Sequence, residues 1–145
     1  MFKRILVAID GSKSALGALD KAIALQKLTG AEIYLLCVFK HHSLFEASLS
    51  MVRPDKIQIP DEALNEYARS VIEYAKEYAA EHEATLVRGF VKGGRPSKAI
   101  ITFAKEKEAD LIVMGAHGTH SVDGMILGSV SHRVAGRAHC PTLVV

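Results

Sequence analysis

The sequence has no tryptophan, only two cysteines and no long apolar run, and each scarcity argues against a class of protein. Cys37 and Cys140 lie far apart and form no CxxC pair, so we expect buried structural thiols rather than a disulfide framework or a thiolate metal centre. No apolar stretch approaches the roughly 20 residues that span a bilayer. The basic start MFKRILVAID lacks the apolar region of a secretory signal. We therefore expect a cytoplasmic protein without a membrane partner.

An excess of one charge is also missing. The net charge is +2 at pH 7 and no block of like charges occurs, so electrostatics predict no nucleic-acid partner. With 49% hydrophobic residues, a chain of 145 residues can bury a core of its own. We expect one domain over residues 1–145.

Strand-like and helix-like segments alternate along the chain. The predicted strands cover residues 3–9, 32–38, 85–91, 109–115 and 141–145. The predicted helices begin at Ser12, Pro60, Pro96 and Gly128, and the first and last end at Gly30 and Ala138. The second helix carries an apolar stripe of Leu64, Tyr67, Ala68, Val71, Ala75, Tyr78 and Ala79. Residues 39–59 show neither period. Five strands alternating with four helices predict an α/β fold with a doubly wound parallel sheet.

Two places qualify as a ligand site, because ligands of such sheets bind beyond the carboxyl ends of the strands. Asp10 follows the first strand, and Gly115 ends the fourth. The stretch GAHGTHSVDGMILGS, residues 115–129, holds four glycines whose amides can approach an anion closely. Glycine also serves turns alone, but a helix beginning at Gly128 and Ser129 adds unpaired amides, and the combination favours phosphate binding. Ser131 adds a hydroxyl.

The glycine spacing carries a resemblance. Gly115-x2-Gly118-x9-Gly128-Ser129 resembles the G-x2-G-x9-G-[ST] signature of the nucleotide-binding universal stress proteins. The likeness covers almost the whole chain, including the DLIVMG strand and the short final strand. Neither a GxxxxGK[ST] loop nor a GxGxxG fingerprint is present.

The resemblance implies a Rossmann-like fold of the adenine nucleotide alpha hydrolase type, with strand order 3-2-1-4-5. It also implies bound ATP, or AMP or ADP, with a divalent cation such as Mg²⁺. The predicted nucleotide contacts are Ala8, Ile9, Asp10, Val38, Met114, Gly115, His117, Gly118, Gly128, Ser129, Val130 and Ser131.

The polar candidates have different roles. Asp10 can accept hydrogen bonds from a ribose hydroxyl or an adenine amino group, or it can simply cap the helix that begins at Ser12. His117, between two motif glycines, is expected to hydrogen-bond phosphate. His120 and His132 lie near it in sequence, but HExxH is absent and no cysteine or glutamate lies close by, so no metal site is assigned.

The apolar candidates form a wall for the base. The resemblance supports Val38 and Met114 as contacts of the base, and Ala8 and Ile9 lie nearby at a strand end. Each of the four is also an ordinary core residue when taken alone.

No catalytic residue is predicted, because no anchored lysine, general base or triad is visible. The favoured function is a nucleotide-dependent sensor or regulator of the stress response. The alternatives are a slow ATPase and an interaction module of the same fold that binds no nucleotide. A flavodoxin-like flavin carrier is disfavoured by the absence of tryptophan.

The final strand predicts a homodimer. Pro141 guards only its beginning, and residues 142–145 carry no charge, although soluble proteins usually blunt an exposed edge strand. Two copies can pair antiparallel about a two-fold axis, and the resemblance points the same way. The alternative is a monomer whose edge is covered by a loop.

Overall fold

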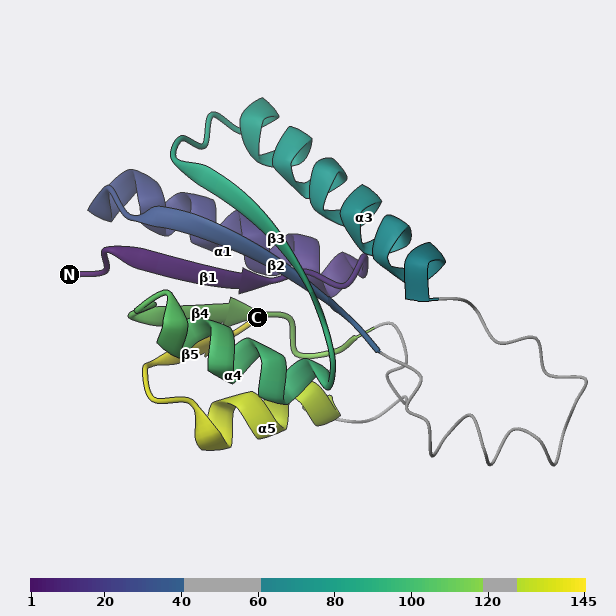
Figure 1. Ribbon diagram of the computed structural model, residues 1–145. Coiled ribbons are helices and arrows are strands. Elements are labelled where there is room, and N and C mark those ends of the chain that lie inside the picture. Colours follow the sequence, from purple (N-terminus) through teal and green to yellow (C-terminus); the bar gives the residue numbers. More distant parts are fainter. Residues whose placement is uncertain (41–60, 119–127) are drawn as a thin grey trace, which may run out of the picture.

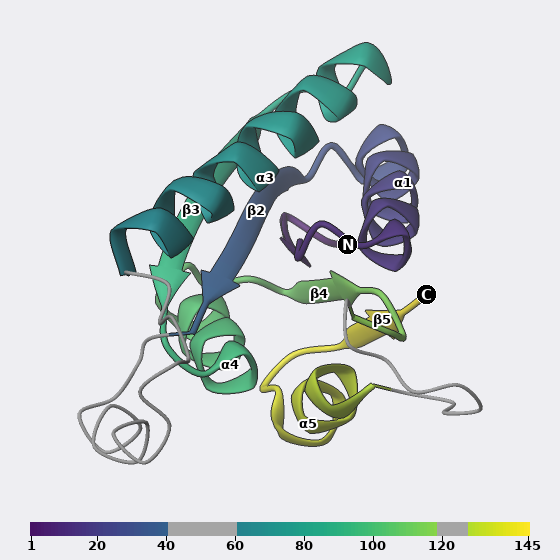
Figure 2. The same cartoon turned by 90° about the vertical axis from the view of Figure 1, so that its right-hand side faces the viewer.

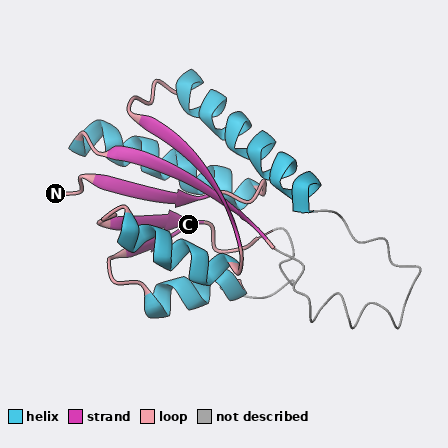
Figure 3. Ribbon diagram, in the orientation of Figure 1, coloured by secondary structure: helices cyan, strands magenta, loops and turns pink. Residues whose placement is uncertain are grey.

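The computed structural model describes residues 1–40, 61–118 and 128–145 (Figure 1). Five strands form one parallel sheet in the order β3-β2-β1-β4-β5, as expected. The strands are β1 (Arg4–Ala8), β2 (Glu32–Phe39), β3 (Val87–Gly93), β4 (Leu111–Met114) and β5 (Thr142–Val144). All of them run in one direction, so their carboxyl ends share one edge of the sheet (Figure 3).

Helices cover both faces of this sheet, which makes three layers (Figure 2). They are α1 (Lys13–Thr29), α3 (Asp61–Glu81), α4 (Pro96–Glu106) and α5 (Ser129–Arg137). The first two pack on one face, where Leu19 and Ala75 join the buried strand residues. The other two pack on the opposite face, where Phe103 and Val134 are buried. The doubly wound prediction is confirmed.

Helix α1 begins and ends where the sequence predicted. The Ser12 side chain caps its start by accepting a hydrogen bond from the Ala15 amide at 3.2 Å. Gly30 ends it in the left-handed conformation, with φ of 74°, a geometry that glycine adopts without strain. Buried Gln26 is satisfied, because its amide group donates to the Ala31 carbonyl and accepts from the Thr85 amide.

Helix α3 departs from its predicted stripe. Ala68, Ala75 and Ala79 are buried as expected, but the fourth buried position is Ile72, which the stripe omitted. Tyr67 was expected to face the core, and this prediction is wrong, because 61% of it is exposed. The buried face is rotated slightly toward Ile72, which leaves Tyr67 at the rim between α3 and α1. Pro60, the predicted start, lies outside the described residues.

Among residues 1–40, 61–118 and 128–145, no helix combines the length and apolarity needed to cross a membrane. Both cysteines are free; Cys37 is buried and Cys140 half-buried. Burial raises the pKa of the Cys37 thiol to about 11, and the negative charge of Asp10 adds to this shift. Burial also raises the pKa of Cys140. Both thiols are therefore protonated and weakly nucleophilic at neutral pH.

Candidate functional site

The carboxyl ends of β1 and β4 bring the two predicted ligand segments together. The strands are neighbours, with Val7 opposite Val113, so the residues that follow them share one crevice. The glycine loop, residues 115–128, is described at 115–118 and at 128. Its Gly118 lies beside Asp10, because a Cβ added at Gly118 would stand 3.0 Å from Asp10 Oδ2. A carboxylate and a glycine backbone therefore face one another across the crevice.

Asp10 has one oxygen engaged. Its Oδ1 accepts hydrogen bonds from the Ser12 amide at 2.9 Å and from the Ser12 hydroxyl at 2.5 Å. The helix cap itself is Ser12, so Asp10 orients the cap from two residues before it. Within the described residues Oδ2 has no hydrogen bond, and the side chain is exposed. One carboxylate oxygen therefore remains available to a ligand.

The glycine loop packs directly on the first turn of α1. A Cβ at Gly115 would overlap Ser14 Oγ and would stand 2.8 Å from the Ser14 carbonyl carbon. The Ser14 hydroxyl also accepts a long hydrogen bond, 3.4 Å, from the His117 amide. Ser14 was not among the predicted site residues. Only the packing of α1 against β4 reveals it.

Helix α5 begins with unpaired amides. Its cap residue is Gly128, which offers no side-chain hydrogen bond, whereas Ser12 caps α1. The first helical hydrogen bond runs from the His132 amide to the Gly128 carbonyl at 3.0 Å. The amides of Ser129, Val130 and Ser131 precede it and therefore have no acceptor inside the helix. Such a helix start carries positive potential and suits an anion.

Two hydrogen bonds hold this helix start against the loop. The Ala116 carbonyl accepts one from the Gly128 amide and lies 2.9 Å from the Ser131 hydroxyl. Ser131 is buried, with 2% of it exposed, and its hydroxyl also lies within reach of the Gly128 carbonyl. The Ser131 side chain therefore ties the loop to α5. Ser129 is exposed.

The predicted apolar wall divides between the two faces of the sheet. Three of its members, Ala8, Val38 and Met114, gather in the cluster beneath α4 and α5, where Val130, another predicted contact, also packs. Ile9 packs instead in the cluster beneath α1 and α3. Neighbouring residues along an extended chain point to opposite faces, which separates Ile9 from Ala8.

His117 carries a buried polar atom without a partner. Its Nδ1 has no hydrogen bond among the described residues, although the atom is shielded from solvent. Such atoms are rare in folded proteins and often mark a functional position. His120 lies outside the described residues, and His132 is exposed on α5. In the part of the chain that is described, no group of three or more His, Cys, Asp or Glu could hold a metal ion.

Comparison with protein families and curated proteins gives one consistent result. The model of the universal stress protein family matches residues 1–145. The universal stress protein YxiE of Bacillus subtilis is 38% identical over 148 residues, which cover 100% of this chain and 99% of that protein. The universal stress protein MJ0531 of Methanocaldococcus jannaschii is 32% identical, over 100% of this chain and 82% of its own length.

Solved structures share the fold. The hypothetical protein MJ0577 superposes with a TM-score of 0.81 at 28% identity, covering 100% of this chain and 96% of its own. A universal stress protein in complex with cAMP gives a TM-score of 0.75 at 24% identity, covering 99% and 97%. The Archaeoglobus fulgidus universal stress protein in complex with dAMP gives 0.70 at 22%, also covering 99% and 97%. Two of these structural relatives are thus complexes with an adenine nucleotide.

Proposed function

The chain belongs to the universal stress protein family, and from this membership and the crevice geometry we propose that it binds ATP or a related adenine nucleotide. It would act as a cytoplasmic regulator whose surface depends on the bound nucleotide. One observation carries the proposal: the uncapped start of α5 faces a glycine loop that lies beside Asp10. Anion-binding amides and a ribose-binding carboxylate thus lie in one crevice.

Each part of the nucleotide has a matching group. The phosphates would accept hydrogen bonds from the amides of Ser129, Val130 and Ser131, and His117 would reach them through its unpartnered ring nitrogen. The ribose hydroxyls would donate to Asp10 Oδ2. The base would lie against the apolar residues beneath α4 and α5 at the strand ends, namely Ala8, Val38 and Met114.

A divalent cation such as Mg²⁺ would bind in this crevice only together with the phosphates of the nucleotide. Residues 115–129 contain no lysine or arginine, so the loop supplies no permanently charged side chain to neutralise the phosphates. Asp10 is the carboxylate next to the described part of the loop. Mg²⁺ is commonly held by one or two carboxylates together with phosphate oxygens and water.

Analysis of the ligand carried by freshly purified protein tests the proposal. Mass spectrometry of the released small molecules should find an adenine nucleotide. Calorimetry on protein stripped of ligand should show saturable binding of ATP with one site per chain. A bound flavin, or no binding of ATP, AMP or cAMP at millimolar concentration, would refute the proposal.

Replacing Asp10 with alanine should weaken ATP binding at least tenfold, about 1.4 kcal/mol. The substitution removes the oxygen that would hold the ribose, Oδ2, as well as the oxygen that orients Ser12. Ser12→Ala is the matched control. It removes the helix cap, at a cost of about 1 kcal/mol of stability, but keeps the carboxylate and the amide that positions it.

Calorimetry should therefore show a much larger loss of ATP affinity in Asp10→Ala than in Ser12→Ala. Thermal melting should show both variants folded at 25 °C. Equal losses of ATP affinity in Asp10→Ala and Ser12→Ala would mean that Asp10 only supports the helix cap.

We also propose that two copies of the chain pair through β5. This strand lies at the edge of the sheet and pairs with β4 on its inner side. Leu143 is 38% exposed, and the Thr142 hydroxyl is shielded from solvent without a hydrogen-bond partner among the described residues. An antiparallel pairing of two such edges would satisfy backbone groups on both copies.

Leu143→Asp should convert the dimer into a monomer, because it would place two like charges near the two-fold axis. Light scattering at high micromolar concentration should show the mass falling by half. Leu28→Asp, at an exposed position on α1, is the control and should leave the dimer intact. A monomeric wild-type protein at that concentration would overturn the dimer.

A further inference from the structure

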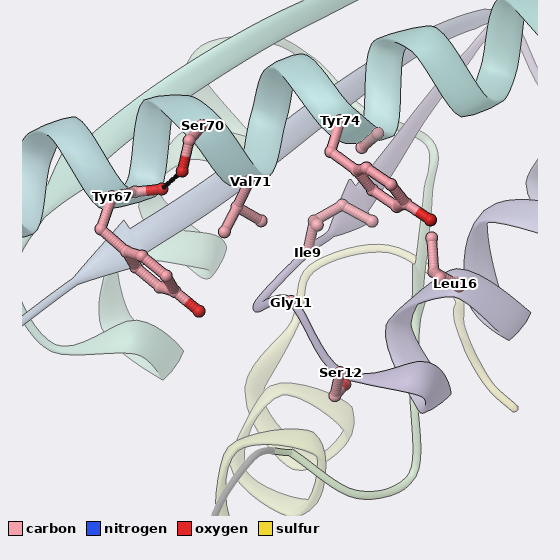
Figure 4. A pocket seen from close by; sticks show the side chains of 9 residues that line it. Ile9, Gly11, Ser12, Leu16, Tyr67, Ser70, Val71 and Tyr74 are labelled. Atoms are coloured by element: carbon pink, nitrogen blue, oxygen red, sulfur yellow. Dashed lines mark hydrogen bonds between the residues drawn. The ribbon is translucent and has the colours of Figure 1, made fainter.

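A cavity of about 310 Å³ lies between α1 and α3, beside the end of β1 (Figure 4). It is lined by Ile9, Gly11, Ser12, Leu16, Tyr67, Ser70, Val71, Tyr74 and Ala75. Of the proposed nucleotide contacts only Ile9 lines it, and Ile9 is the residue that points away from the others. The cavity is therefore separate from the crevice that holds Asp10 and the glycine loop.

Two tyrosines frame the cavity. Tyr67 and Tyr74 project from α3 on either side of Val71, toward Gly11 and Leu16 (Figure 4). Both are unusually exposed for aromatic residues on a packed helix, at 61% and 58%. The Tyr67 hydroxyl lies close to the chain at Gly11, 3.4 Å from where a Cβ would stand. Gly11 has a positive φ of 86°, so any side chain there would be strained.

The polar groups of the lining divide into engaged and available ones. The Ser12 hydroxyl donates to Asp10, and the Ser70 hydroxyl donates to the Tyr67 carbonyl at 2.6 Å. The phenol oxygens of Tyr67 and Tyr74 have no hydrogen bond within the described residues. Among the described side chains of the cavity wall, these two phenols are therefore the ones available to a ligand.

The rest of the lining selects against charge. Ile9, Leu16, Val71 and Ala75 supply an aliphatic floor, and none of the lining residues within the described part of the chain is a lysine, arginine, aspartate or glutamate. An ion placed here would lose hydration without gaining a partner. Aromatic rings favour another aromatic ring, edge-on or offset-stacked, and phenols favour a hydroxyl or a ring N–H. The volume lies at the small end of the range for ligand pockets.

We propose that this cavity binds a small neutral aromatic compound with one hydroxyl or ring N–H, about the size of an indole or a naphthol. Its ring packs on Val71 between the two tyrosine rings. Its polar group exchanges a hydrogen bond with a phenol oxygen. The site requires no nucleotide, so it stands or falls independently of the function proposed above.

Titration with 2-naphthol tests the proposal on the full chain without nucleotide. The chain has no tryptophan, so the probe's fluorescence can be followed against a low protein background. We expect saturable binding, with methyl resonances of Ile9 and Val71 shifting in NMR spectra. Gly128→Val, which should weaken ATP binding at least a hundredfold, should bind the probe as the wild type does. No saturable binding up to the solubility limit would overturn the proposal.

Two variants locate the probe. Val71→Phe fills the cavity and should weaken 2-naphthol binding at least tenfold, whereas Leu28→Phe adds the same ring at an exposed position outside it and should have no effect. The double substitution of Tyr67 and Tyr74 by phenylalanine keeps the rings and removes the hydroxyls. It should weaken 2-naphthol several-fold and leave naphthalene binding unchanged. Unaltered binding of 2-naphthol in Val71→Phe and in the double tyrosine variant would place the probe elsewhere and refute the site.

Discussion

Replacing Gly128 with valine should lower ATP affinity at least a hundredfold, about 2.8 kcal/mol, while the protein stays folded. A Cβ at this position would stand 3.1 Å from the Ala116 carbonyl oxygen and 3.6 Å from His117 Cα. Valine therefore pushes the glycine loop away from the start of α5. It also fills space next to the amides that would bind phosphate. Because Gly128 has φ of −71°, valine fits its backbone conformation and the helix can still form.

The control for this substitution lies on the same helix. Gly136 has no atom within 4 Å of an added Cβ, so Gly136→Ala meets nothing and replaces a poor helix former by the best one. It should bind ATP like the wild type and be more stable by up to about 1 kcal/mol. Calorimetry and far-UV circular dichroism measure the two effects separately. If Gly128→Val bound ATP with wild-type affinity, the proposal that phosphate binds at the start of α5 would be wrong.

Periodicity and caps made the fold predictable from the sequence. Ser12 and Gly30 bound α1 because each satisfies local backbone groups, a property of the residues themselves. The third strand was predicted to start at Thr85, but Leu86 adopts a left-handed φ of 51° and β3 begins at Val87. The leucine side chain gave no sign of that turn. The strand order followed from the resemblance to a known family.

The part of the candidate site that lies at the ends of strands was predictable from the sequence. Asp10 and Gly115 follow strands that turn out to be neighbours, so a rule about sheet edges was enough to bring them together. Placing Ile9 beside Ala8 in one wall ignored the two-residue alternation of strands, which the sequence displays.

Two other features required tertiary packing. The contact between Gly115 and Ser14 depends on how α1 docks against β4. The tyrosine cavity depends on the rotation of α3 about its own axis, and an apolar stripe defines that rotation only loosely, as the exposure of Tyr67 shows.

Gly115→Ala should be the most destabilising single methyl group that can be added in the described part of this crevice. The new Cβ would overlap Ser14 Oγ and stand 2.8 Å from both the Cβ and the carbonyl carbon of Ser14. The hydroxyl can rotate away, but the carbonyl carbon belongs to the first turn of α1, so the helix must move. Overpacking of this kind costs about 1–3 kcal/mol. For a chain of this size, the melting temperature should fall by roughly 4–12 °C.

A double-mutant cycle separates this clash from any general effect of alanine. Ser14→Gly removes the Oγ and the Cβ but leaves the backbone carbonyl, so it should restore part of the stability that Gly115→Ala loses and not all of it. By itself Ser14→Gly should destabilise α1 by about 0.5 kcal/mol, since glycine is a poorer helix former than serine. A melting temperature of Gly115→Ala within 1 °C of the wild type would contradict the close packing of α1 on the glycine loop. Loss of ATP binding in Gly115→Ala, recovered in step with stability on adding Ser14→Gly, would show that this packing also sets the width of the crevice.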